Sequence, residues 1–159
     1  MYSQQKELFR GMSKDFIKEV MSTSIKESHD KGSLIFREGE RAGHLYILLE
    51  GQINIRIGDG WQMVSTVYHK GEVFGWSGIV GRQVYTATAE CKEPTKLLKI
   101  SVEKLQRILE KDQANGFVFY KRLAGILGDR LEHSYRMISC AVDLLIRSKV
   151  SVPEDLSIS

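Results

Sequence analysis

Between two strand-like segments the chain reads Gly71-Glu72-Val73-Phe74-Gly75-Trp76-Ser77-Gly78-Ile79-Val80-Gly81-Arg82-Gln83-Val84-Tyr85-Thr86-Ala87-Thr88. After the opening Gly71, five further residues are small: Gly75, Ser77, Gly78, Gly81 and Ala87. Glycine at this density permits a tight turn, or brings backbone N–H groups close to a bound group. The stretch therefore predicts a small-residue turn within a β fold, with room for an anion-sized ligand.

On both sides of this stretch, from Ser24 to Ser101, the pattern has the two-residue period of β-strands. Ile53, Ile55 and Ile57 alternate with polar residues, as in a half-buried strand. Asp59-Gly60 is the strongest hairpin signal in the chain. Many short strands with turn signals about every eight to twelve residues predict an all-β sandwich or jelly roll, with Thr95–Ser101 as its closing strand.

Helical spacing replaces this pattern at the two ends of the chain. Residues 4–21 predict two short helices broken near Gly11, with Ser13 as the N-cap of the second. After the closing strand, a short helix from Ser101 or Val102 to Lys111 and a long helix from about Gln113 to Ile146 are predicted. Residues 147–159 form a polar tail in which Pro153 stops any helix.

The long helix carries a seam whose members are separated alternately by four and three residues: Tyr120, Ala124, Leu127, Leu131, Ser134, Ile138, Ala141 and Leu145. A period of 3.5 residues favours pairing with a second long helix. A neighbouring stripe, Phe119, Leu123, Ile126 and Met137, is predicted to cover the β fold. The preferred interpretation is a homodimer, and the alternative is one broad apolar face docked on its own subunit.

In chain order, the residues of the 71–88 stretch resemble the phosphate-binding cassette of the cyclic-nucleotide-binding domain family. Phe74-Gly75 and Thr86-Ala87-Thr88 fit that cassette, and Gly39 and Glu50-Gly51 fit the glycines of earlier turns. The similarity covers about residues 10–145. It implies a mainly β protein with an antiparallel β-roll or jelly roll (double-stranded β-helix), short N-terminal helices and a long C-terminal dimerisation helix. Residues 1–146 are then the regulatory domain.

The resemblance also implies a ligand-binding site at Phe74, Gly75, Trp76, Ser77, Gly78, Arg82, Tyr85, Thr86 and Ala87. Trp76 occupies the position of the family's ribose-binding Glu, and Tyr85 that of its phosphate-binding Arg. Arg82 either replaces the missing arginine or is a solvated loop residue. Two versions of the module follow. One binds a cyclic nucleotide or another small anion through unusual contacts, and the other, preferred for cyclic AMP, keeps the fold and the dimer helix without the nucleotide.

Length and composition limit the other possibilities. With 159 residues, 42% apolar and 27% charged, the chain is expected to be one globular domain. It has no apolar run of the ~18 residues that span a bilayer, and a cytoplasmic protein without membrane contact is expected. The net charge of +3 with interspersed signs does not favour nucleic-acid binding, and nothing follows the long helix that predicts a DNA-binding domain.

Enzymatic alternatives are weaker, and a non-catalytic protein is predicted. A metal-dependent cupin would use His44 and His69 with Glu50, but Tyr46 stands at one of its ligand positions, and no metal site is predicted. A haem-sensing relative would need an axial ligand such as Cys91, His69 or His133, which no spacing supports. Gly75-Trp76-Ser77-Gly78-Ile79 lacks the last glycine of the hydrolase motif.

Overall fold

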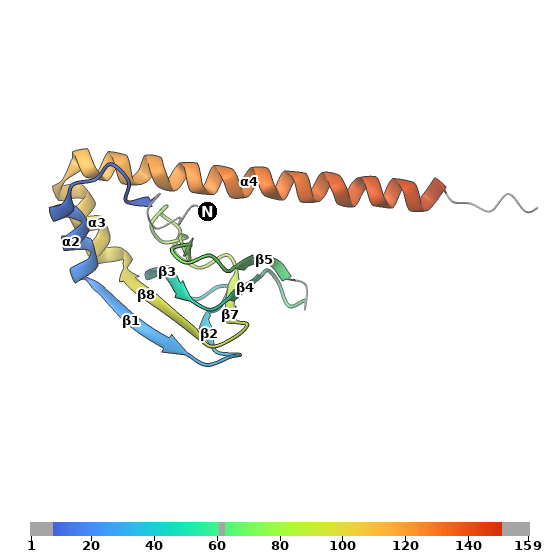
Figure 1. The fold of residues 1–159 in the computed structure, drawn as a ribbon, viewed down its shortest axis with the longest axis horizontal. Helices are drawn as coiled ribbons and strands as arrows, with labels where there is room; N and C mark the ends of the chain where they lie inside the picture. Colours follow the sequence, from blue (N-terminus) through green and yellow to red (C-terminus); the bar gives the residue numbers. More distant parts are fainter. Residues whose placement is uncertain (1–7, 61–62, 151–159) are drawn as a thin grey trace, which may run out of the picture. The chain divides into compact units, whose positions relative to one another are not determined.

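The computed structural model describes residues 8–60 and 63–150. The chain divides into two compact units, residues 1–122 and 123–159, which are described separately. The first unit holds all of the described strands and two of the helices, and the long helix α4 begins in it (Figure 1).

Two four-stranded antiparallel sheets make up the β part of the first unit. In sheet order, the first contains β1 (Ser24–His29), β8 (Thr95–Ser101), β3 (His44–Glu50) and β6 (Val73–Phe74), and the second contains β2 (Leu34–Phe36), β7 (Thr88–Cys91), β4 (Ile53–Arg56) and β5 (Met63–Val67). Strands far apart in sequence are neighbours in both sheets, as in a β-roll. The predicted fold class is confirmed.

Alternate residues of the strands build the core of the roll. Ile53 is fully buried and Ile55 partly buried, as the two-residue period predicts. Ile57 is exposed and lies beyond the end of β4, because the chain leaves the strand at Gly58, whose φ of +73° suits glycine. The predicted hairpin is confirmed by the antiparallel pairing of β4 with β5. Trp61, predicted to begin the next strand, is outside the described residues.

The helices follow local capping signals. Helix α2 (Lys14–Ser22) begins after Ser13, whose Oγ accepts a hydrogen bond of 3.2 Å from the N–H of Phe16. Gly11 has a φ of +83°, which explains the predicted break. Residues 4–7 of the first predicted piece are outside the described residues. Helix α3 (Val102–Lys111) begins at the second of the two predicted first residues, with Ser101 as its N-cap, and ends as predicted.

Helix α4 (Gln113–Val150) is longer than predicted. Residues 147–150, assigned to the polar tail, are helical, because nothing in them breaks a helix before Pro153. The remainder of that tail is outside the described residues. Phe119, Leu123 and Ile126 are buried, as the second stripe predicts, whereas Met137 is 60% exposed because the helix continues past its last buried residue. Within residues 8–60 and 63–150, no helix is both long and apolar enough to cross a membrane.

Candidate ligand-binding cassette

The small-residue stretch forms a turn that packs closely on the strand region before it. Gly75 leaves β6 with a φ of +69°, and a Cβ at this position would lie 2.8 Å from the ring of Tyr46. A Cβ on Gly78 would lie 2.0 Å from the carbonyl oxygen of Ala42. The N–H of Arg82 closes the turn on the carbonyl of Ser77 at 3.0 Å. Glycine is therefore required at positions 75 and 78 by the approach of residues 42 and 46, before any ligand is considered.

Tyr85 lies inside the roll. Its side chain is 4% exposed, and its ring stacks on Phe36 with centroids 3.9 Å apart and planes at 17°. The phenol donates a hydrogen bond of 2.8 Å to the carbonyl of His44 and accepts one of 3.1 Å from the N–H of the same residue. Its backbone is held as well, because the Tyr85 N–H donates to the Glu40 carbonyl at 2.9 Å. Tyr85 is thus a fixed part of the core.

Further aromatic rings continue from this stack. Phe36 faces Tyr46 at 5.6 Å, and Tyr46 faces Phe74 at 5.3 Å. Burial raises the pKa of the Tyr85 phenol and, more strongly, that of Tyr46, where the neighbouring Tyr85 adds to the effect. Both rings stay neutral over the physiological range. The side of the roll that faces the cassette is therefore filled by uncharged aromatic groups.

The predicted site residues are brought into one region of the first unit, with different exposure. Phe74, Ser77, Gly78 and Tyr85 are buried, Gly75, Trp76 and Ala87 are partly buried, and Arg82 and Thr86 are exposed. Arg82 makes no ion pair with any described residue, which agrees with the solvated-loop interpretation. No cationic side chain of the predicted set points into the core beside Tyr85.

Backbone donors remain in the turn. Among the described residues, no acceptor is present for the N–H groups of Ser77 and Thr86. Successive N–H groups in turns form concave sites that attract anions, whereas these two N–H groups are nine positions apart in the sequence. The turn therefore keeps two backbone donors without an acceptor among the described residues, and the one cationic side chain of the predicted set, Arg82, is exposed.

Two residues of this region were not predicted as site residues. Phe36 stacks on Tyr85, and the backbone of His44 holds its hydroxyl. No motif links positions 36, 44 and 85; the loops meet through the bridge between Arg41 and Val84. Burial, followed by the nearby Lys99 charge, lowers the pKa of the His44 imidazole.

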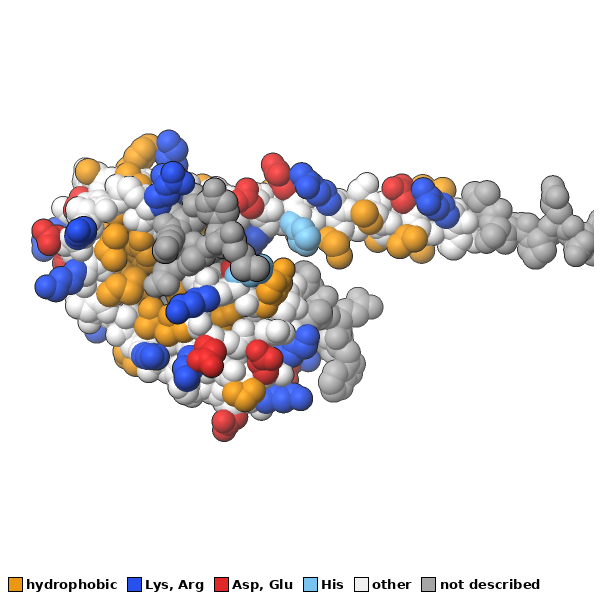
Figure 2. Space-filling view, viewed as in Figure 1, with side chains coloured by type: hydrophobic (Ala, Val, Ile, Leu, Met, Phe, Trp, Pro, Cys, Tyr) orange, Lys and Arg blue, Asp and Glu red, His pale blue; other side chains and the backbone are white. Residues whose placement is uncertain are grey.

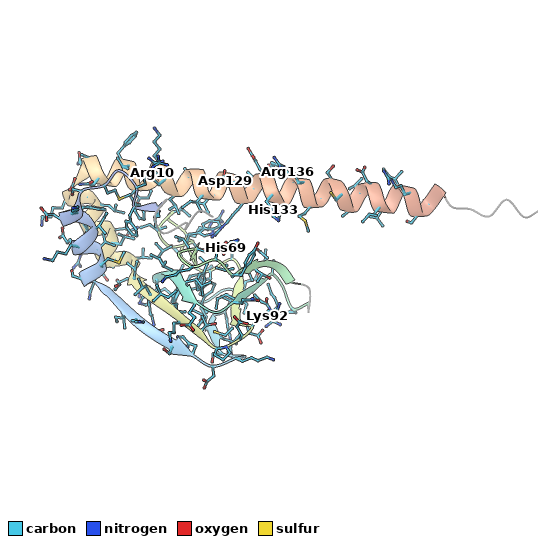
Figure 3. All side chains as sticks on the ribbon, viewed as in Figure 1. Arg10, His69, Lys92, Asp129, His133 and Arg136 are labelled. Carbon is cyan, nitrogen blue, oxygen red and sulfur yellow. The ribbon has the colours of Figure 1, made fainter. Side chains whose placement is uncertain are left out.

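The residues of the cupin alternative do not converge. Glu50 is exposed and pairs with Lys96 at 2.9 Å. His69 lies on the loop between β5 and β6 (Figure 3), and its ring is tilted at 46° to that of Tyr68. Tyr46 belongs to the aromatic core. Within the described part of the chain, no group of three or more His, Cys, Asp or Glu side chains is arranged to hold a metal ion.

The haem alternative gains no support either. Cys91 is buried in the core of the roll, and burial raises the pKa of its thiol. His133 is exposed on α4 (Figure 3).

Comparisons of the sequence with known proteins agree on one family. The family model described as "Cyclic nucleotide-binding domain" matches residues 26–112, more than half of the chain. The cAMP-activated global transcriptional regulator CRP of Pasteurella multocida (strain Pm70) is 26% identical over 122 residues. That alignment covers 75% of this chain but only 56% of the regulator, so the chain spans about half the length of this relative.

Solved structures show the same fold. A putative cyclic nucleotide-binding protein from Geobacter metallireducens GS-15 is 26% identical with a TM-score of 0.70, over 82% of this chain and 98% of that one. A cyclic nucleotide-binding domain from Methylobacillus flagellatus KT has a TM-score of 0.77 at 18% identity, over 87% and 82% of the two chains. At that identity, the second likeness concerns the fold alone.

Proposed function

The chain belongs to the cyclic nucleotide-binding domain family, and on that basis we propose that it is a non-catalytic regulatory domain that signals as a homodimer without binding cyclic AMP or cyclic GMP. The observation that carries the proposal is the position of Tyr85. Its phenol is already hydrogen-bonded to both backbone groups of His44 and its ring is stacked on Phe36.

A cyclic nucleotide needs a cation for its phosphate in a buried site. Loss of one partner of a buried, hydrogen-bonded charge pair costs about 2–5 kcal/mol, and each 1.4 kcal/mol is tenfold in affinity. A neutral Tyr85 in the arginine position therefore moves a micromolar ligand to about millimolar. Trp76, in the position of the ribose-binding Glu, offers no carboxylate for a ribose hydroxyl.

The dimer is supported by the exposed seam of α4. Tyr120, Leu131 and Ile138 are 41%, 51% and 60% exposed in the single chain. Hydrophobic side chains along α4 lie at the surface in Figure 2. Burying one large apolar side chain stabilises by about 1.5–3 kcal/mol, so a repeated seam strongly favours a partner helix. Through such a helix pair, a conformational change in the β-roll of one subunit could alter the second subunit.

The nucleotide part is tested by isothermal titration calorimetry with cyclic AMP and cyclic GMP. Wild-type protein is expected to bind neither more tightly than about 1 mM, whereas a Trp76→Glu/Tyr85→Arg variant restores both missing groups and is expected to bind at least tenfold more tightly. Wild-type binding in the micromolar range would overturn the proposal. Circular dichroism of the variant verifies that it is folded.

A second candidate rests on the N–H groups of Ser77 and Thr86 that have no acceptor among the described residues. They favour a small anionic effector held by the backbone of the turn. A thermal-shift screen with inorganic phosphate, sulfate and cyclic dinucleotides tests it, because a ligand at one hundred times its Kd adds about 2.7 kcal/mol of stability. Thr86→Pro removes one of these donors, and Thr86→Val retains it as the matched control.

A further inference from the structure

A pocket of about 290 Å³ lies at the elbow where α3 meets α4, away in sequence from the cassette. It is lined by Gln106, Leu109, Glu110, Gln113, Gly116, Phe117 and Tyr120. The elbow is tight, because a Cβ on Gly116 would lie 2.6 Å from the carbonyl of Leu109. Glycine at this position brings the helices together and leaves the surface of α4 open beside two aromatic rings.

The pocket has the chemistry of a receptor for a cation. Phe117 and Tyr120 are 70% and 41% exposed, and Glu110 is exposed and near enough to Tyr120 to act on its hydroxyl electrostatically. A carboxylate beside aromatic faces attracts an ammonium or guanidinium group. Neither Glu110 nor Lys121 has an ion-pair partner among the described residues.

The heptad repeat of α4 indicates which cationic side chain of a second copy would lie at this pocket. In the heptad frame of the seam, Phe117 and Tyr120 are core positions, while Gly116 and Lys121 flank the core on opposite sides, at g and e. In a parallel, in-register helix pair, a g residue faces the e residue that lies about five positions later in the partner. Gly116 itself is buried against Leu109, so Lys121 of the second copy, on that side of the helix pair, would meet the part of the pocket that α3 supplies, where Glu110 lies.

We propose that the elbow pocket of each subunit receives Lys121 of a second copy of this chain and thereby fixes a parallel, in-register helix pair; this rests on the proposed homodimer. Glu110 supplies the countercharge and Tyr120 the aromatic face, and the two-fold axis repeats the contact. The interaction surface is thus a charged pocket at one end of an apolar seam.

The flanking residues further along α4 favour the parallel arrangement. In the parallel register, Met137 faces Val142 of the second copy, so two exposed apolar residues cover each other. In the antiparallel register that places Tyr120 opposite Leu145, Val142 faces Lys121 and Met137 faces Arg130. That register puts charges against apolar side chains on both flanks. The parallel one has a single such contact, Leu144 against Lys149, and places Lys121 beside a carboxylate.

Charge reversal tests the contact. Glu110→Lys and Lys121→Glu are each expected to raise the dimer Kd about tenfold in sedimentation-equilibrium experiments, because each creates two like-charge contacts. The double variant Glu110→Lys/Lys121→Glu is expected to return to within about threefold of wild type. Glu132→Lys, exposed on α4 outside the pocket, is the matched control and leaves Kd unchanged.

Mixing the two single variants shows whether Glu110 contacts Lys121 of the other subunit or Lys121 of its own subunit. The Glu110→Lys and Lys121→Glu chains restore both contacts only in the heterodimer, so more than half of the dimers in an equimolar mixture are expected to be heterodimers by native mass spectrometry. A dimeric wild type with a statistical mixture would overturn this inference and leave the proposed function standing. A monomeric wild type would overturn both.

The direction of the pair is measured by cross-linking. Ala141→Cys in a Cys140→Ser background is expected to form an intermolecular disulfide on mild oxidation, because residue 141 meets its own copy in the parallel pair. In the antiparallel register it faces residue 124, about 25 Å along the helix from its own copy. Failure of Ala141→Cys to cross-link, with efficient cross-linking between Ala141→Cys and Ala124→Cys chains, would contradict the inference.

Discussion

The phenol of Tyr85 is bonded to both backbone groups of His44: it donates to the carbonyl at 2.8 Å and accepts from the N–H at 3.1 Å. The two residues come from segments 41 positions apart. The hydroxyl bonds to the first residue of β3 and the ring stacks on Phe36, so Tyr85 contributes to the stability of the roll.

Tyr85→Phe is expected to lower the free energy of unfolding by about 1–3 kcal/mol, because it leaves the partly buried N–H and C=O of His44 without their partner. Urea denaturation followed by circular dichroism measures the change. Tyr68→Phe is the matched control, since Tyr68 is 56% exposed and its change should be within about 0.5 kcal/mol. Equal stability of Tyr85→Phe and wild type would show that water replaces the hydroxyl at no cost.

Gly78→Ala is expected to destabilise the domain by more than about 2 kcal/mol, because its Cβ would lie 2.0 Å from the Ala42 carbonyl and the backbone must move. Gly125→Ala provides the opposite control. No atom lies within 4 Å of a Cβ there, apart from the helix's own backbone, and alanine is about 1 kcal/mol better than glycine inside a helix. Thermal denaturation of both variants should give shifts of opposite sign.

If the seam of α4 is the dimer interface, charged substitutions in it should make the protein monomeric. Leu131→Glu combined with Ile138→Asp places two carboxylates on exposed apolar positions that we propose to be buried between helices. Sedimentation velocity is expected to show a monomer at concentrations where wild type is dimeric. Ser139→Glu, on another face of α4, should leave the sedimentation coefficient unchanged. An unaltered coefficient in the double variant would mean that the seam is not the interface.

Acid is expected to destabilise the domain partly through His44. Burial, and then the charge of Lys99, lower the pKa of this imidazole below its ordinary 6.5, although Glu27 opposes them. Because the folded state resists protonation of this imidazole, protonation favours the unfolded state. The free energy of unfolding is therefore unaffected above the unfolded-state pKa and falls as the pH drops below that value and through the folded-state pKa. Between about pH 7 and pH 5, urea denaturation should therefore show a steeper loss for wild type than for His44→Gln.

His133→Gln, on the exposed part of α4, is the control for this pH series and should follow wild type. If His44→Gln loses stability with falling pH as steeply as wild type does, His44 is not the group responsible. The comparison isolates one side chain, because both variants keep every carboxylate of the chain.

Much of the fold follows from signals that lie within a few residues of one another. The bounds of β8 and α3 agree with the predicted segments, and Ser13 caps α2 as expected. These features depend on side-chain periodicity and on hydrogen bonds between near neighbours in sequence, which a single sequence displays directly. The same holds for the seam of α4, whose 3.5-residue repeat needs no knowledge of the rest of the chain.

The outcome at the cassette depended on contacts that no local pattern contains. The substitution of arginine by Tyr85 is visible in the sequence, but its burial against Phe36 and its bonds to His44 arise from the pairing of loops through Arg41 and Val84. The need for glycine at position 78 likewise comes from the carbonyl of Ala42. A buried hydroxyl forms hydrogen bonds with the groups that the strand register places next to it. The register is set by the assembled roll and not by any one segment of the sequence.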